Sequence, residues 1–335
     1  MDLFSGAGGL TLGLKWAGFQ VVGAIEADAL AAETYRANHP EVRLWAGDIR
    51  QVSVEAVAEE LGLTATGLDL LAACPPCQGF SAIRTKKKGT YPDARNDLLF
   101  EVVRFVDGLR PLAVMLENVP GLSSDPRLGM LVGRLRRRGY SVAVRTLDAA
   151  QYGVPQRRRR VLLMASRDGR IAFPGASDRS VSVRDVIGAL PRAGSSGDPL
   201  HDLAETRSPR VASIICGVPP SGGSRTSLPP ELVLGCHGRA RGFYDVYGRM
   251  DWERVAPTIT GGCVNPSKGR FLHPEENRAI TLREAALLQS FPKSYYFSLK
   301  HGKYAAAAMI GNAVPPLFAQ SQAAAVFEHL RRRTT

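Results

Sequence analysis

The chain has 335 residues, 44% of them hydrophobic, which is enough for one large domain and a smaller one. It carries 43 Lys and Arg against 31 Asp and Glu, and the resulting net charge of +12 favours a polyanionic partner, nucleic acid first. No apolar run reaches the roughly 18 residues of a membrane span, no signal segment opens the chain, and five cysteines do not suggest a disulfide framework, so we expect a cytoplasmic protein.

The first half of the chain alternates short apolar runs with helical patterns, which is typical of βαβ units in an α/β fold. Only four residues precede a glycine-rich turn, so we expect either a start further upstream or a domain that tolerates a stub as its first strand. The predicted strands cover residues 21–25, 68–73, 112–116, 141–147 and 161–165. The predicted helices cover residues 29–38, 54–61, 98–108 and 128–138.

The pattern changes after Pro174. Residues 191–275 are rich in Gly, Pro, Ser and Arg and contain few long periodic segments, whereas helical patterns return at residues 281–289 and from 304 to the end. We therefore expect one domain at residues 1–190, a separate loop-rich domain at 191–280, and a last segment at 281–335.

A glycine-rich turn at residues 5–9, SGAGG, links the first strand to a helix. Glycines let the backbone approach a ligand closely, and the following helix N-terminus is electropositive. Glu26 ends the next strand, where an acid can hold both hydroxyls of a ribose, and Asp48 ends the third, where it can accept from an adenine amino group. Each acid alone is slightly better explained as a helix N-cap or a surface charge, but together with the glycine-rich turn they predict an adenosine site. The spacing matches neither G-x-G-x-x-G nor G-x-x-x-x-G-K-[ST], which disfavours nicotinamide and flavin enzymes.

Residues 74–81 read CPPCQGFS and present Cys77 on a stiff turn directly after a buried strand. The two prolines cannot continue a strand or a helix, so this cysteine is well placed to act as a nucleophile. Cys74 and Cys77 also form a CxxC pair, which leaves a redox dithiol or half of a zinc site as alternatives. Both are disfavoured because the other three cysteines are isolated, and we interpret Cys74 as a small buried residue.

Two further segments carry charge beside apolar strands. Residues 112–121 read LAVMLENVPG, so Glu117 ends a buried strand and should face the crevice at the carboxyl edge, with a capping carboxylate as the alternative. Residues 151–161 read QYGVPQRRRRV, which places Arg158 and Arg160 on one face if the segment is extended. Such a pair can hold a phosphate, or a base carbonyl and a thiolate, and a solvated charge run is the alternative.

These motifs resemble, in order and spacing, those of the DNA (cytosine-5)-methyltransferase family, over nearly the whole chain. DLFSGAGG resembles the first cofactor motif, PPCQGFS the catalytic cysteine motif, ENV the catalytic acid motif and QRRRR the Q-x-R-x-R motif. RAITLRE, at residues 278–284, resembles the motif that supports target recognition, and GNAVPP, at 311–316, the last motif, which folds back beside the first. The resemblance implies a Rossmann-like S-adenosylmethionine-dependent methyltransferase fold with a smaller, irregular target-recognition domain. It makes residues 1–190 the catalytic and cofactor-binding domain, 191–280 the target-recognition domain, and 281–335 a hinge and a C-terminal helix that return to the catalytic domain.

The resemblance also implies residue roles. Cys77 would attack C6 of a flipped cytosine, Glu117 would act at N3, and Arg160, supported by Arg158, would contact the base O2 and stabilise the thiolate. C5 would take its methyl group from S-adenosylmethionine, which leaves as S-adenosylhomocysteine. Phe4 would stack on adenine, with Glu26 on the ribose, Asp48 on the adenine amine, and Asn312 and Val314 closing the pocket. The implied cofactor residues are Phe4, Ser5, Gly6, Gly8, Gly9, Glu26, Asp48, Ile49, Leu98, Asn312 and Val314.

The expected partner is duplex DNA, and a cognate restriction endonuclease is a further candidate. We expect the enzyme to be monomeric and associated with the nucleoid. Residues 79–96 resemble the loop that closes over the flipped base. The candidate DNA contacts are Ser81, Arg84, Lys86, Lys87 and Lys88 in this loop, and Arg239, Arg241, Tyr244 and Arg249 in the recognition region. Two alternatives are a tRNA cytosine-5 methyltransferase of the same family, whose Cys-Phe-Thr signature is absent here, and a non-catalytic DNA-binding regulator.

Overall fold

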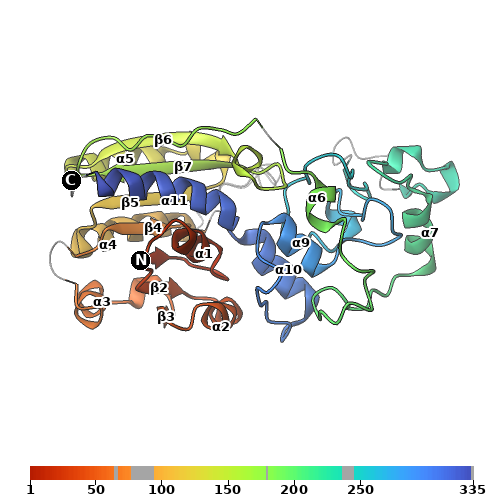
Figure 1. The fold of residues 1–335 in the computed structure, drawn as a ribbon, viewed down its shortest axis with the longest axis horizontal. Helices are drawn as coiled ribbons and strands as arrows, with labels where there is room; N and C mark the ends of the chain where they lie inside the picture. Colours follow the sequence, from red (N-terminus) through yellow and green to blue (C-terminus); the bar gives the residue numbers. More distant parts are fainter. Residues whose placement is uncertain (64–66, 77–93, 179, 236–244, 333–335) are drawn as a thin grey trace. The chain divides into compact units, whose positions relative to one another are not determined.

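The computed structural model describes residues 1–63, 67–76, 94–178, 180–235 and 245–332. The chain divides into two compact units (Figure 1). Unit 1 comprises Met1–Tyr152, Arg159–Ala176 and Val314–Thr335, and unit 2 comprises Gly153–Arg158 and Ser177–Ala313. The boundary expected at residue 190 therefore lies inside unit 2, which also includes residues 281–313, whereas the C-terminal helix belongs to unit 1.

Unit 1 is built on a sheet that has seven strands within the described residues, in the order β3-β2-β1-β4-β5-β7-β6. All neighbours pair in parallel except β7, which is antiparallel to β5 and β6. This mixed α/β architecture confirms the expected fold class. The strands are β1 (Asp2–Leu3), β2 (Gly23–Glu26), β3 (Arg43–Ala46), β4 (Leu70–Ala73), β5 (Ala113–Asn118), β6 (Ser141–Asp148) and β7 (Arg159–Ser166).

The first strand is the predicted stub, yet it lies in the middle of the sheet. β1 pairs with β2 on one side and with β4 on the other. Backbone hydrogen bonds from Ala72 to Met1 (2.9 Å) and from Cys74 to Leu3 (3.2 Å) continue its ladder with the β4 segment. A two-residue strand is stable here because the neighbouring strands satisfy its backbone groups on both edges.

Helices cover both faces of the sheet. In unit 1 they are α1 (Gly9–Trp16), α2 (Ala29–Asn38), α3 (Val54–Glu60), α4 (Glu101–Leu109), α5 (Pro126–Arg137) and α11 (Pro316–Arg331). The apolar residues of α3, α4 and α5 share one core with Leu71, Ala73, Val114 and Leu116 of the central strands. α1 and α11 pack against each other, and α11 crosses in front of the sheet in Figure 1.

Proline divides the C-terminal helical pattern that begins at residue 304. α10 (Gly302–Asn312) ends before Val314, and α11 begins at Pro316. Pro315 and Pro316 cannot donate the backbone hydrogen bonds of a continuing helix, so the break is local in origin. It also coincides with the boundary between the units, which lies between residues 313 and 314.

Unit 2 has little regular structure, as its composition predicts. Its described helices besides α10 are α6 (Val183–Ile187), α7 (Pro209–Gly217) and α9 (Leu282–Leu288). Thr281 and Glu284 form a capping box at the start of α9, and α9 packs against both α6 and α10. A small apolar cluster that includes Ile214, Ile215 and Leu272 forms a second core in this unit.

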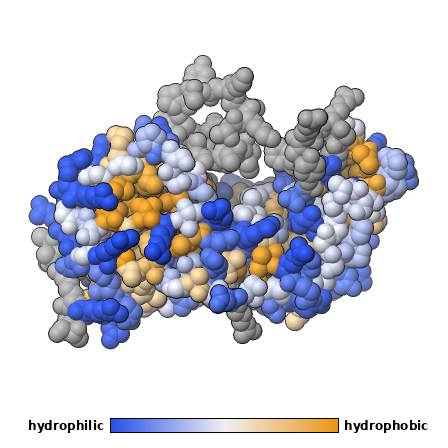
Figure 2. All heavy atoms as spheres, turned by 90° about the horizontal axis from the view of Figure 1, so that it is seen from above, coloured by the Kyte–Doolittle hydropathy of each residue, from blue (hydrophilic) through white to orange (hydrophobic). Residues whose placement is uncertain are grey.

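Within the described ranges, no helix combines the length and apolar character needed to cross a membrane. Figure 2 shows mostly hydrophilic residues on the described surface in that view, with an apolar patch on the part contributed by unit 1. Single exposed apolar side chains such as Val144, 38% exposed, are ordinary for a folded chain.

Candidate active site

The turn between β1 and α1 has a strained backbone. Phe4 (φ 61°), Gly6 (φ 55°) and Gly8 (φ 95°) all lie in the left-handed region. This conformation costs a residue with a side chain about 1 kcal/mol or more, and such residues gather where a ligand binds. Gly8 is the N-cap of α1, and Gly9 and Ser5 are buried beside it. The N–H groups of Ser5, Gly6 and Gly8 donate to the Ile25 carbonyl, the Glu26 carboxylate and the Ser5 carbonyl, so internal hydrogen bonds fix the turn at the carboxyl edge of β1.

Glu26 fixes this turn from the end of β2. Its Oε2 accepts a hydrogen bond from the Gly6 N–H at 2.7 Å, and its Oε1 accepts one from the Asp28 N–H at 2.7 Å. Burial raises the pKa of the Glu26 carboxyl, although these two backbone donors oppose the effect. Each oxygen keeps a further lone pair, with which the carboxylate can accept hydrogen bonds from a pair of vicinal hydroxyls.

The other predicted cofactor residues of unit 1 follow β3 and precede α4. Asp48 caps the turn after β3 and pairs with Arg50, whose hydrogen bonds hold the pKa of the Asp48 carboxyl below its usual range. Its side chain is 31% exposed and hence open to a ligand. Ile49 is buried, and Leu98 is half-buried against the same core as Phe4.

The last two predicted cofactor residues belong to different units. Asn312 is the last residue of α10 in unit 2, whereas Val314 is a buried residue of unit 1. The structure therefore places the turn, Glu26, Asp48, Ile49, Leu98 and Val314 in one compact body, and Asn312 in the other.

Glu117 is a buried acid of unit 1 with a partner on each carboxyl oxygen. It lies at the end of β5, is 4% exposed, and its Oε1 forms an ion pair with Arg160 Nε at 2.9 Å. The other oxygen, Oε2, accepts a hydrogen bond from the Cys74 thiol at 3.0 Å. Arg160 reaches Glu117 from β7, the antiparallel neighbour of β5. The predicted acid and one of the two predicted arginines are thus in contact.

Arg158 does not have the position that its sequence pattern suggested. It is 3% exposed, and its guanidinium donates to the backbone carbonyls of Ile259 (2.9 Å), Gly311 (3.1 Å) and Ala313 (3.0 Å). All of these partners belong to unit 2, as does Arg158 itself. Its guanidinium is committed to backbone acceptors, so we reassign Arg158 from a catalytic to a structural role.

Arg249 also departs from the sequence-based interpretation, which made it a DNA contact. The side chain is 2% exposed and donates to the carbonyls of Val218 (2.9 Å), Ile215 (2.9 Å) and His273 (3.1 Å). It also reaches the Glu276 carbonyl and the Asn277 side chain. A buried guanidinium with so many internal acceptors presents no donor to a nucleic acid, so Arg249 organises the interior of unit 2.

Three residues make contacts that the sequence analysis did not predict. Cys74, which we interpreted as a small buried residue, is only partly buried and contacts Glu117, as described above. Asn118, 2% exposed, donates from Nδ2 to the Pro75 carbonyl at 3.0 Å and so ties the end of β5 to the turn after β4. Gln156 donates to the Leu288 carbonyl and accepts from the Ile259 N–H inside unit 2. The parallel pairing of strands 68–73 and 112–116 was the signal that could have revealed the first two.

Most of the predicted contacts with the base and with DNA lie outside the described residues. They are Cys77, Ser81, Arg84, Lys86, Lys87, Lys88, Arg239, Arg241 and Tyr244. Where the structure does describe the chain, no three His, Cys, Asp or Glu side chains gather as metal ligands.

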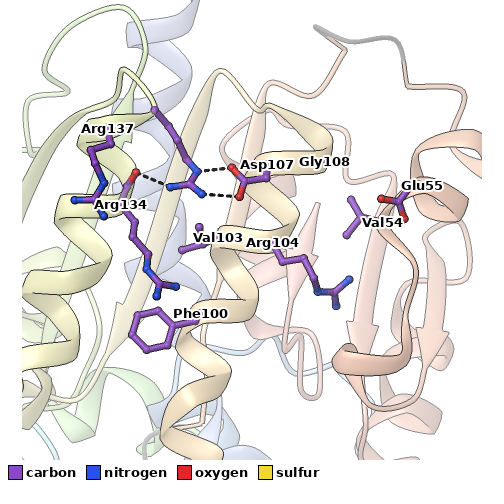
Figure 3. Close-up of a pocket in the computed structure, with 10 residues that line it drawn as sticks. Val54, Glu55, Phe100, Val103, Arg104, Asp107, Gly108, Arg134 and Arg137 are labelled. Carbon is purple, nitrogen blue, oxygen red and sulfur yellow. Dashed lines mark hydrogen bonds and ion pairs between the residues drawn. The ribbon is translucent and has the colours of Figure 1, made fainter.

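A groove on unit 1 is separate from these residues. It has a volume of about 790 Å³ and lies between α3, α4 and α5, where Figure 3 shows several arginines. Arg104 donates to the carbonyls of Val52 (2.8 Å) and Ile49 (2.5 Å), and Arg138 pairs with Asp107 at 2.6 Å (Figure 3 shows the last pair). None of the predicted site residues lines the groove, and these two arginines serve helix packing.

Comparison with known sequences gives matches over nearly the whole chain. The profile of the C-5 cytosine-specific DNA methylase family matches residues 1–214 and 224–328. The Type II methylase M.HgiDII of Herpetosiphon aurantiacus is 37% identical over 332 residues, covering 94% of this chain and 91% of the relative. The Type II methyltransferase M1.HphI of Haemophilus parahaemolyticus is 34% identical, covering 98% of this chain and 86% of the relative.

Solved structures agree with the sequence matches. A proposed DNA modification methyltransferase encoded within a prophage of E. coli has a TM-score of 0.71 and 25% identity, with 98% of both chains covered. The Dnmt2 methyltransferase of S. pombe has a TM-score of 0.63 and 20% identity, again with 98% of both chains covered. The second of these likenesses extends to the fold alone.

Proposed function

Because this chain belongs to the C-5 cytosine-specific DNA methylase family and is a DNA (cytosine-5)-methyltransferase, we propose that it methylates a flipped cytosine of duplex DNA through a covalent intermediate on Cys77. The observation that carries the proposal is the pairing of Glu117 with Arg160 at 2.9 Å, at the carboxyl end of β5. The chain of β4, the neighbouring strand, leads within a few residues to Cys77. The acid and the arginine thus come from adjoining strands at one sheet edge, where α/β enzymes bind their substrates.

The reaction needs an activated cytosine because C5 alone is too weak a nucleophile. The Cys77 thiolate forms a bond to C6 and displaces the π electron pair of the C5–C6 double bond into the ring. Glu117 donates a proton to N3, which neutralises the resulting negative charge. The enamine carbon C5 would then form its bond to the methyl group, as the bond from the methyl carbon to the sulfonium sulfur breaks and S-adenosylhomocysteine leaves. A base, which we take to be water, removes the C5 proton, the C6–S bond breaks, and the N3 proton returns to Glu117. Arg160 orients the Glu117 carboxyl throughout and contributes positive charge next to the base O2.

The residues around the glycine turn fit S-adenosylmethionine. Gly6 and Gly8 let the backbone of the turn approach a ligand closely, the Glu26 carboxylate suits a ribose, and the partly exposed Asp48 carboxylate suits an amino group. We propose that Phe4, with its left-handed backbone, presents its ring to the adenine, and that Val314 of the same unit closes the pocket. When bound, S-adenosylmethionine supplies an electrophilic methyl group on its sulfonium.

Access to C5 and C6 requires the target base to leave the helical stack, at a cost of a few kcal/mol. We propose that residues 79–96 close over that base and that residues 191–280 contribute the sequence recognition. The names of the Type II relatives further support a role in a restriction-modification pair, in which methylation of nucleoid DNA protects a site from a cognate endonuclease.

A methyl-transfer assay tests the proposal. Purified protein with labelled S-adenosylmethionine should label duplex DNA, and the Cys77→Ser variant should label none, since a hydroxyl does not provide the thiolate nucleophile. Unmethylated tRNA serves as a second substrate in the same assay. Efficient labelling of tRNA without labelling of DNA would contradict the proposal, as would a Cys77→Ser variant with wild-type activity.

A further inference from the structure

The strand register brings a second cysteine to the catalytic acid. β4 and β5 are parallel neighbours, and their pairing runs from Leu70 with Ala113 to Ala73 with Leu116. One residue further, Cys74 lies opposite Glu117. Paired residues of neighbouring strands project to the same face of a sheet, so the thiol and the carboxyl are neighbours because of the backbone register.

The contact adds a hydrogen bond to the ion pair that already holds the carboxyl. Cys74 Sγ donates to Glu117 Oε2 at 3.0 Å, while Arg160 Nε lies 2.9 Å from Oε1. Each oxygen of a carboxyl that is 4% exposed therefore has its own partner, one neutral and one charged. Rotation of the carboxyl group would break both contacts, so its plane is defined from two sides.

The two partners differ in what they do to the acid. A guanidinium is a permanent cation, whereas a thiol is a weak neutral donor. The thiol on Oε2 thus holds the orientation of the group without adding a second charge beside it. The next residues reinforce the arrangement, because Asn118 Nδ2 donates to the Pro75 carbonyl at 3.0 Å.

We propose that Cys74 is a positioning residue, whose thiol holds Glu117 in the orientation that delivers a proton to N3 of the target cytosine. The inference rests on the proposed function, because it presupposes that Glu117 acts on the base. It assigns the two cysteines of the CPPC segment to different tasks: Cys77 forms the covalent bond, and Cys74 acts through the acid.

Three variants test the role of the thiol, with DNA methylation measured as kcat and as KM for DNA and for S-adenosylmethionine. Cys74→Ala should lower kcat by about 10- to 100-fold with both KM values nearly unchanged, because a misplaced catalytic group loses rate without losing binding. Cys74→Ser restores a donor at nearly the same place and should recover most of kcat. Cys216→Ala is the matched control, since Cys216 is an exposed residue of α7, and it should behave as the wild type.

Formation of the covalent adduct with DNA that contains 5-fluorocytosine gives a second readout. Attack at C6 needs the proton at N3, so Cys74→Ala should form the adduct more slowly by a similar factor, with an unchanged melting temperature. Wild-type kcat in Cys74→Ala, or equal losses in the Ala and Ser variants, would overturn the inference. A wild-type enzyme that methylates no DNA would instead contradict the proposed function, so the two failures are distinguishable.

Discussion

Two arginines separated by one residue in the sequence perform different tasks. Arg160 pairs with Glu117, whereas Arg158 donates to backbone carbonyls of unit 2. The motif and the family resemblance predicted Glu117 and Arg160 as site residues, and the two are in contact. The sequence could not show that Arg158 is buried, since QRRRR reads equally well as an exposed charge run, and its acceptors come from residues about a hundred or more positions away. The same reason explains Arg249, whose carbonyl partners are also distant in sequence.

Removing Arg160 should affect the reaction more than the fold. The Arg160→Ala variant should lose on the order of 100-fold in kcat. Glu117 would lose its charged partner, and the positive charge proposed to lie next to the base O2 would be removed. The melting temperature of Arg160→Ala should differ from that of the wild type by less than the melting temperature of Arg158→Ala does. Steady-state kinetics and thermal unfolding, measured on the same preparations, provide the comparison.

Removing Arg158 should affect the fold more than the reaction chemistry. Arg158→Ala deletes three hydrogen bonds to buried carbonyls, which at about 1 kcal/mol each amounts to a loss of about 3 kcal/mol in the free energy of unfolding. Denaturant titration measures this loss. An Arg158→Ala variant of wild-type stability but with no activity would return this residue to the catalytic set.

At the scale of elements, local sequence patterns predicted individual helices well. They did not predict which elements lie next to one another in the fold. The helix at residues 29–38 was predicted with its observed bounds, Ala29–Asn38, because a capping Asp28 precedes it and the helix has a buried face. The central position of β1 could not be predicted from two residues, since it depends on β2 and β4 on either side. The contact between α1 and α11 joins segments about 300 residues apart, and it was expected only from the family resemblance, in which the C-terminal helix returns to the catalytic domain.

This contact makes Gly13 a sensitive position. A methyl group on Gly13 would lie 2.4 Å from the Ala319 Cβ and 2.6 Å from the Pro316 carbonyl oxygen, so α1 and α11 would have to separate. Gly13→Ala should therefore lower the free energy of unfolding by about 1–3 kcal/mol, and it should weaken cofactor binding because α1 begins at the glycine turn. Unfolding curves and cofactor titration measure both effects.

Gly129 provides the matched control in an exposed helix. A methyl group there has no heavy atom within 4 Å, so Gly129→Ala in α5 should stabilise the protein by up to about 1 kcal/mol. Equal stabilisation by both substitutions would show that α1 and α11 are not in tight contact.

At the scale of the whole molecule, composition and motif order predicted the class of protein, but not its division. The net charge of +12 pointed to a nucleic acid, and the family profile agrees with that expectation. The unit boundaries lie at residues 152/153, 158/159, 176/177 and 313/314, so unit 2 includes the segment Gly153–Arg158. Hydrogen bonds of Gln156 and Arg158 with distant residues hold that segment in unit 2. No change of composition marks it, so the sequence could not reveal this boundary.

The covalent adduct tests the central claim most directly. Wild-type enzyme, S-adenosylmethionine and duplex DNA containing 5-fluorocytosine should give a stable protein–DNA complex, because fluorine at C5 cannot leave as a proton does. Mass spectrometry of the digested complex should locate the modified base on Cys77, and the Cys77→Ser variant should form no complex. An enzyme that methylates DNA but gives no adduct, or gives one on a different residue, would contradict nucleophilic attack by Cys77.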